Sequence, residues 1–212
     1  MTDADTEPTN FERILSKAIT LKISQALELL EVFTGIETSN SYAIVADGQT
    51  VAVAAEKNKG ARDTMGRLLL QHWRTFDMVL TDPEDKKSLL LHHPFRFLLS
   101  ELEITGKDGR KLGLLRQRAS FPFVFRSFDV LDGSGAPVMC CTSSCLHPWT
   151  FRFCKGGQEV GVVYRRWPGI VSAIASNRDD YTVEFKGGLS DSERMLLLCS
   201  ALFIDLLYFE AK

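Results

Sequence analysis

Short runs of alternating apolar and polar residues occupy most of the chain after residue 35. This alternation is typical of half-buried β-strands, because successive side chains of a strand point to opposite faces. The runs are separated by turns that carry Gly or Asp, such as Asp47-Gly48, which suit the tight turns of hairpins. The paired runs predict five antiparallel hairpins, at residues 42–55, 76–91, 102–115, 128–141 and 151–164.

The end of the chain has a different pattern, because residues 195–209 are apolar at every position except Ser200 and Asp205. A helix that is apolar around its whole circumference must be surrounded by protein or by lipid. This segment reaches only about 22 Å as a helix, against roughly 30 Å for a bilayer core, and Asp205 would be costly there. The pattern favours a core helix, with a membrane span as the alternative. The candidate core positions are Met195, Leu198, Leu202, Asp205 and Phe209.

Two further features complete the predicted fold. Apolar residues within 11–30 combine helical spacing with denser runs, which predicts a helix over the first part of that segment. A sheet of many strands exposes its edges unless it closes, and a closed barrel needs the filling that the C-terminal helix supplies. The predicted fold class is therefore mainly β: an antiparallel hairpin meander closed into a β-barrel around a hydrophobic C-terminal helix, with an N-terminal helix. We expect a disordered tail over residues 1–10 and a single domain over residues 11–212.

Composition gives little reason to expect a highly charged partner. The 212 residues are 45% hydrophobic and carry a net charge of -2, so no overall attraction to nucleic acid or anionic membranes is expected. Residues 1–10 are acidic and lack the basic and apolar regions of a secretory signal, which predicts an intracellular protein. Four of the five Cys lie within residues 140–154, and we expect reduced thiols rather than a disulfide framework.

Motifs of enzymatic catalysis are absent from the sequence. Ser134 lies in a hairpin turn without the strand-turn-helix context of a nucleophile elbow, and there is no phosphate-cradling glycine loop or dinucleotide fingerprint. The Cys residues of 140–154 and His147 are residue types that bind zinc, but their spacing is not that of a zinc finger. Small core residues are the simpler interpretation. We therefore expect a protein that is not an enzyme.

The best candidate binding group combines basic and aromatic side chains near the end of the last hairpin. Arg suits phosphate, and Trp suits the headgroup level of a bilayer, so the group predicts a lipid-headgroup site. The alternative is a solvated strand face with Trp167 as a packing residue. The candidate members are Arg152, Lys155, Arg165, Arg166 and Trp167.

Four segments carry a family resemblance: residues 29–44 (LLEVFTGIETSNSYAI), 165–170 (RRWPGI), 176–185 (SNRDDYTVEF) and 201–210 (ALFIDLLYFE). Together they resemble the phospholipid scramblase family, in order and spacing, over nearly all of the chain from about Phe11. That family is related to the tubby-like and LURP-one-like proteins. The resemblance therefore implies a tubby-like β-barrel around a hydrophobic C-terminal helix, which agrees with the fold predicted from the hairpins.

The resemblance implies phospholipid scrambling, the passive movement of lipids between leaflets, by a cytoplasmic or peripherally membrane-associated protein. Membrane phospholipids would be the partner, with no nucleic acid and no obligate protein partner expected. The alternative is a soluble tubby-like binding or regulatory module for a phosphoinositide-like ligand, a protein or nucleic acid, without scrambling activity. Burial of the apolar helix favours this alternative, because little apolar surface would remain to perturb a bilayer.

Calcium, which stimulates the eukaryotic members of that family, is the candidate cofactor that the resemblance implies. The family's EF-hand-like loop aligns with residues 177–188, where only Asn177 and Asp179 suit calcium. Gly188 stands at the twelfth position in place of a bidentate carboxylate, so the segment is either a degenerate calcium loop or a polar turn leading into a strand. The family's palmitoylated cysteine stretch, expected after Glu56, has no counterpart because residues 57–76 contain no Cys.

Overall fold

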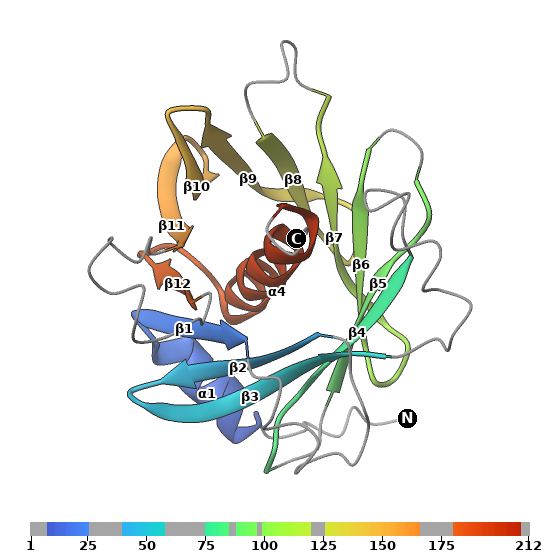
Figure 1. The fold of residues 1–212 in the computed structure, drawn as a ribbon, viewed down its shortest axis with the longest axis vertical. Helices are drawn as coiled ribbons and strands as arrows, with labels where there is room; N and C mark the ends of the chain where they lie inside the picture. The colour runs from blue at the N-terminus through green and yellow to red at the C-terminus, as the bar shows by residue number, and fades with distance from the viewer. Residues whose placement is uncertain are drawn as a thin grey trace, which may run out of the picture.

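The computed structural model describes residues 8–25, 40–57, 75–84, 88–96, 99–119, 126–165 and 180–208. Within these ranges the chain forms two helices and twelve strands (Figure 1). The helices are α1 (Asn10–Lys17) and α4 (Asp191–Tyr208). The strands are β1 (Thr20–Gln25), β2 (Ser41–Ala46), β3 (Gln49–Glu56), β4 (Phe76–Thr81), β5 (Ser88–His93), β6 (Glu101–Gly106), β7 (Lys111–Gln117), β8 (Arg126–Asp132), β9 (Pro137–Ser144), β10 (His147–Lys155), β11 (Gln158–Arg165) and β12 (Asp180–Phe185).

The strands form one closed antiparallel barrel in which each strand pairs with its neighbours in the sequence. Closure depends on β1, which pairs with β2 on one side and with β12 on the other. Ile23 of β1 lies opposite Ile44 in the first pairing and opposite Tyr181 in the second. Because every strand has two partners, no sheet edge is left open. The predicted fold class, mainly β and closed, is confirmed.

All five predicted hairpins are present, as β2–β3, β4–β5, β6–β7, β8–β9 and β10–β11. The β2–β3 turn uses Asp47 and Gly48 at φ 48° and 82°, as a tight hairpin turn requires. Strand β1 was not predicted, because its apolar residues Leu21 and Ile23 follow α1 closely and also fit a continued helix. Pairing with β2 and β12, which are remote in sequence, gives this segment its strand conformation.

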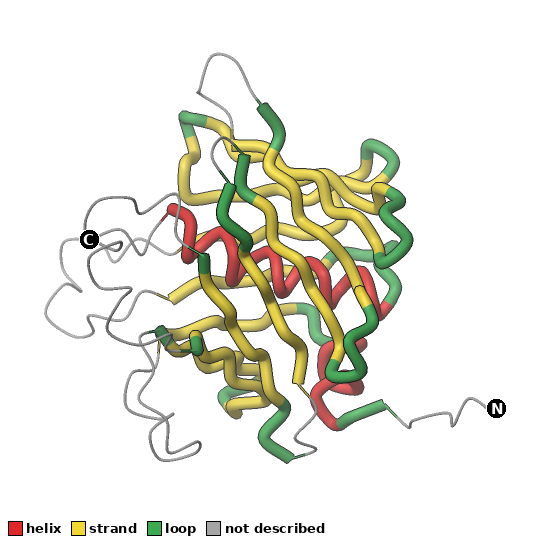
Figure 2. The backbone as a smooth tube through the Cα atoms, turned by 90° about the vertical axis from the view of Figure 1, so that its right-hand side faces the viewer, coloured by secondary structure: helices red, strands yellow, loops and turns green. Residues whose placement is uncertain are grey.

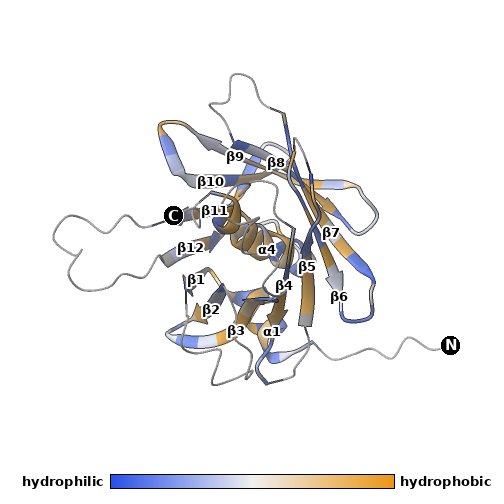
Figure 3. Ribbon diagram, turned by 45° about the vertical axis from the view of Figure 1, so that its right-hand side comes forward, coloured by the Kyte–Doolittle hydropathy of each residue, from blue (hydrophilic) through white to orange (hydrophobic). Residues whose placement is uncertain are grey.

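Helix α4 runs through the middle of the barrel, with strands around it (Figures 1 and 2). Leu197, Leu198, Leu202 and Phe203 have no exposed surface, and α4 is among the most hydrophobic elements of the fold (Figure 3). The predicted core positions Leu198, Leu202 and Asp205 are buried and Met195 is half-buried. In the described part of the chain, no helix combines the length and apolarity needed to cross a bilayer.

Helix α1 packs on the first turns of α4 at one end of the barrel. Its buried side chains, Phe11 and Leu15, are four residues apart and therefore share one face of the helix. Arg194 of α4 donates from Nε to the Leu15 carbonyl at 2.8 Å and also to the Ala18 carbonyl. Its guanidinium lies 4.4 Å from the centroid of the Phe185 ring. One buried cation thus satisfies the last carbonyls of α1 and joins the two helices.

The inner face of the barrel approaches α4 so closely that Gly113 on β7 has no room for a side chain. A Cβ at this position would lie 2.7 Å from the Leu131 carbonyl oxygen and would overlap the end of the Leu196 side chain. Because the carbonyl belongs to a paired strand, it has little freedom to move away. Glycine at this position therefore allows β7 to contact the helix.

We predict that Gly113→Ala lowers the free energy of unfolding by about 1 to 3 kcal/mol, because it overpacks the contact between β7 and α4. Gly187→Ala is the matched control, since a Cβ there meets no atom within 4 Å. Chemical denaturation measures both variants. Equal stability of the two would contradict the close contact at Gly113.

Candidate functional site

The two ends of the barrel differ in what surrounds α4. At the proximal end, where α4 begins, α1 packs on the helix. At the distal end, where α4 finishes, β8 begins at Arg126, β10 begins at His147 and β11 finishes at Arg165. Figure 2 shows α4 passing lengthwise between the strands from one end to the other.

A buried acidic residue, Asp205, lies in the distal part of α4 and is only 6% exposed. The hydroxyls of Tyr181 on β12 and Tyr42 on β2 lie close to its carboxyl, and Arg165 supplies a nearby positive charge. Burial raises the pKa of Asp205, and the two hydroxyls and Arg165 counter only part of that effect. Burial, together with the neighbouring Asp205, also raises the pKa of Tyr181. These groups give the buried carboxyl of Asp205 polar and positively charged surroundings.

Tyr208, in the last turn of α4, is held by a cation and by polar and aromatic contacts. The Arg126 guanidinium carbon lies 4.1 Å from the centroid of the Tyr208 ring, and Arg126 Nη1 donates to the Pro148 carbonyl at 3.4 Å. Gln117 Nε2 donates to the Tyr208 hydroxyl at 3.3 Å, and the Phe128 ring centroid is 6.1 Å from that of Tyr208. Burial raises the pKa of Tyr208 to about 12, so the hydroxyl is neutral at physiological pH.

Most of the exposed large apolar side chains of the described residues lie at the distal end. Leu146, in the β9–β10 turn, is 81% exposed. Phe95, just after β5, is 58% exposed, and Leu99, just before β6, is also exposed. The fourth, Ile19, lies at the proximal end. The distal end therefore combines exposed apolar side chains with Arg126 and Arg165, a combination suited to a surface that is both anionic and apolar.

The predicted lipid-headgroup residues occupy different parts of the barrel. Arg152 on β10 pairs with Glu159 at 2.7 Å, and Lys155 pairs with Glu193, at the start of α4, at 2.8 Å. Arg165 lies at the distal end, where its guanidinium carbon is 6.0 Å from the centroid of the Trp149 ring. The structure does not bring Arg152, Lys155 and Arg165 together. A headgroup role for these residues stays a prediction.

Several candidate residues fall outside the described ranges: Arg166, Trp167, Asn177, Asp179 and Phe209. The calcium loop and the aromatic member of the headgroup site therefore also stay predictions. Among the residues that the structure does describe, no three His, Cys, Asp or Glu side chains are grouped in a way that could hold a metal ion.

Sequence reasoning missed Tyr42, Tyr181, Arg126 and Leu146 as members of this region. The signal for the two tyrosines was Asp205 itself, because a buried carboxylate needs donors from inward-facing positions of neighbouring strands. Choosing them required knowing that β2 and β12 both flank β1. Leu146 gave a weaker signal, as an apolar residue within a turn.

We predict that Asp205 makes the free energy of unfolding depend on pH. Its folded pKa is raised above the ordinary value of 3.8, so its contribution to stability is full below about pH 4 and is lost as pH rises through the folded pKa. Asn cannot ionise, so the Asp205→Asn variant does not lose this stability as pH rises. Relative to the wild type, the variant should therefore gain stability as pH rises from about 4 to 7.

Denaturant titrations across that pH range measure the difference. Asp108→Asn is the control, because Asp108 has an exposed side chain in a turn. A difference between Asp205→Asn and the wild type that does not change with pH would contradict a buried, ionisable Asp205.

Comparison with known proteins identifies the family. The model of the Scramblase family matches residues 2–211. Phospholipid scramblase 1 of Homo sapiens is 29% identical over 93% of this chain and 65% of its own length. Phospholipid scramblase 2 of Bos taurus is 29% identical over 90% of this chain and 68% of its own length. Phospholipid scramblase family member 5 of Homo sapiens is 23% identical over 92% of this chain and 76% of its own length.

The chain spans about two thirds of the length of the first two of these relatives. No solved structure gives a significant match. The family model nevertheless covers almost every residue, including all of the described barrel and α4. The protein therefore belongs to the Scramblase family.

Proposed function

We propose that this member of the Scramblase family binds membrane phospholipids with the distal end of its barrel and allows them to move passively between leaflets. The observation that carries the proposal is Leu146, an apolar side chain that is 81% exposed at the same end as Arg126 and Arg165. Exposed apolar surface next to cations suits contact with a phospholipid layer. The relatives that bear the name phospholipid scramblase support the same class of partner.

The side chains of the distal end suit successive depths of a lipid layer. Arg126 and Arg165 provide guanidinium groups for charge-assisted hydrogen bonds to phosphates. Trp149 and Tyr208 are half-buried rings, which favour the headgroup level. Leu146 is placed to enter the apolar layer below it. Binding of this kind needs no covalent chemistry, so scrambling would be a passive consequence of how lipids are held.

A second candidate function is a binding or regulatory module without scrambling activity. It is favoured by the burial of α4, because Leu198, Leu202 and Phe203 are fully covered by the barrel and cannot contact lipid in this conformation. Such a module would recognise a phosphoinositide-like ligand, a protein or nucleic acid. Both candidates place the protein peripherally at a membrane if its ligand is a lipid.

We predict that Leu146→Glu weakens binding to vesicles of phosphatidylcholine and phosphatidylserine by about tenfold. The change removes an apolar contact and adds a charge that anionic lipid repels. Co-sedimentation with such vesicles measures the effect. Because Leu146 is exposed, the fold should be unaffected.

The matched control is Gln158→Glu, which adds the same charge at an exposed site on the proximal end. It should bind vesicles like the wild type. Equal loss of binding in both variants would show that net charge alone matters, and equal retention would show that the distal end does not dock. Either outcome would remove this docking surface.

We predict that the membrane-bound protein is released by a carbonate wash, because α4 is covered by the barrel. Purified protein should then be added to vesicles containing fluorescent phospholipids, with chemical quenching of the outer leaflet. Quenching beyond the outer-leaflet fraction supports scrambling. Binding without extra quenching supports the module that does not scramble, whereas retention after carbonate would contradict a permanently buried α4.

A further inference from the structure

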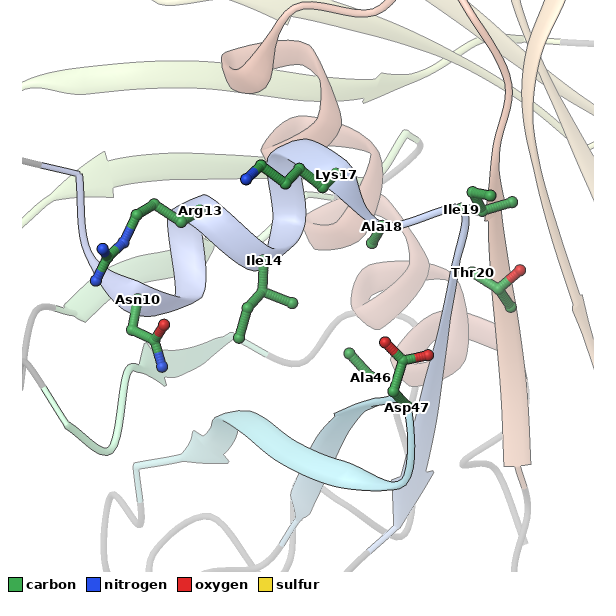
Figure 4. A pocket seen from close by; sticks show the side chains of 9 residues that line it. All are labelled: Asn10, Arg13, Ile14, Lys17, Ala18, Ile19, Thr20, Ala46 and Asp47. Atoms are coloured by element: carbon green, nitrogen blue, oxygen red, sulfur yellow. The ribbon is translucent and has the colours of Figure 1, made fainter.

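A groove of about 580 Å³ lies at the proximal end of the barrel, between α1 and the turn that joins β2 to β3 (Figure 4). Arg13, Ile14 and Lys17 line it from α1, at spacings that place them on one side of the helix. Asp47 lines it from the turn, and Ile19 from the segment after α1. The volume is within the range of roughly 300 to 1,000 Å³ that small-ligand sites occupy.

The wall formed by α1 is firmly attached to the rest of the fold. A capping box between Thr9 and Glu12 closes the start of the helix. The carboxylate of Asp82 accepts a hydrogen bond at 3.1 Å from a backbone N–H in the first turn. Arg194 bonds the Leu15 carbonyl near the other end of the helix. Because both ends of α1 are held, the groove is formed before any ligand arrives.

The charged side chains of the groove have no ion-pair partners among the described residues. Arg13 and Lys17 are exposed, four residues apart on α1, and no acidic side chain pairs with either. Asp47, on the facing turn, also forms no ion pair. Elsewhere on the surface, Arg152 pairs with the carboxylate of Glu159. Like charges at this spacing slightly destabilise a helix, and although the position of Lys17 in the last turn suits the helix dipole, the dipole does not account for Arg13.

We propose that this groove binds a ligand that carries both a phosphate and an ammonium group, as the headgroup of an aminophospholipid and a free phosphoamine do. Arg13 and Lys17 would hold the phosphate, and Asp47 would hold the ammonium across the groove. Ile14 lies between these groups in Figure 4 and would contact the carbon chain that links them. The proposal concerns the end of the barrel opposite Leu146 and does not depend on the proposed function.

The charge arrangement favours a ligand with both charges over simpler ligands. A plain anion held by Arg13 and Lys17 would leave Asp47 without an ionic partner, and a plain cation held by Asp47 would leave Arg13 and Lys17 without one. A divalent metal would find a single carboxylate in the groove lining, too few for the oxygen ligands that such ions require. Two cations on α1 and one anion on the opposite turn fit a ligand that carries a phosphate and an ammonium joined by a carbon chain.

Calorimetric titration of the full chain with phosphoethanolamine, glycerol phosphate and inorganic phosphate tests the proposal. The wild type should bind phosphoethanolamine most tightly. Arg13→Gln/Lys17→Gln should weaken that binding by about tenfold. Asp47→Asn should remove the preference over glycerol phosphate. The control, Lys107→Gln/Arg116→Gln, alters two exposed cations elsewhere that also lack ion pairs, and should bind like the wild type.

Unchanged binding by Arg13→Gln/Lys17→Gln, with thermal unfolding showing that the variant is folded, would overturn the site. So would a wild type that binds none of the three probes. Equal affinity for phosphoethanolamine and inorganic phosphate would overturn the ammonium contact at Asp47. Competition by phosphatidylethanolamine vesicles would identify a lipid as the source of the headgroup, and its absence a free phosphoamine.

The outcome can be separated from that of vesicle docking. Loss of vesicle binding in Leu146→Glu concerns the distal end only. If phosphoethanolamine binding persists in Leu146→Glu while Arg13→Gln/Lys17→Gln abolishes it, the groove is an independent site. If both variants lose phosphoethanolamine binding to the same extent, the separate groove is rejected.

Discussion

The fold depends on covering a helix that is apolar on every side. Helix α4 has no polar face to turn toward water, so a single sheet packed on one side would leave the other side exposed. Twelve strands closed around it remove that surface from solvent and leave no open sheet edge. The close approach at Gly113 shows how little space remains between barrel and helix.

Because α4 fills the interior of the barrel, the side chains that could bind a ligand lie at its two ends. The proximal end is closed by α1, which Arg194 joins to α4 through backbone carbonyls. At the distal end, Asp205 is surrounded by hydroxyls and by Arg165, and Leu146 is exposed to solvent. The interior is occupied by the helix itself, so contact with lipids or small ligands is expected at the rim and outer surface. A lipid path through the interior would require α4 to leave it.

Much of the architecture was predictable because its signals are local. A turn such as Asp47-Gly48 selects a hairpin through the φ angles that it permits, and the apolar end of the chain predicts a core helix through its length and composition. Strand β1 was missed because the pairing that determines it joins residues remote in sequence, such as Ile23 and Tyr181. Proximity in sequence also suggested that Arg152 and Arg165 act together, although they lie at different positions along the barrel.

The sequence by itself determined the hairpins, the buried terminal helix and the family to which the chain belongs, since each of these rests on a pattern within a segment or on the order of segments. Only the tertiary structure decided which strand closes the barrel, which hydroxyls meet Asp205, and that Arg13 and Asp47 line one groove. The physical reason is that a contact between distant segments depends on strand register and helix placement. Strand register and helix placement follow from packing the whole chain around α4, so the sequence of a single segment does not determine them.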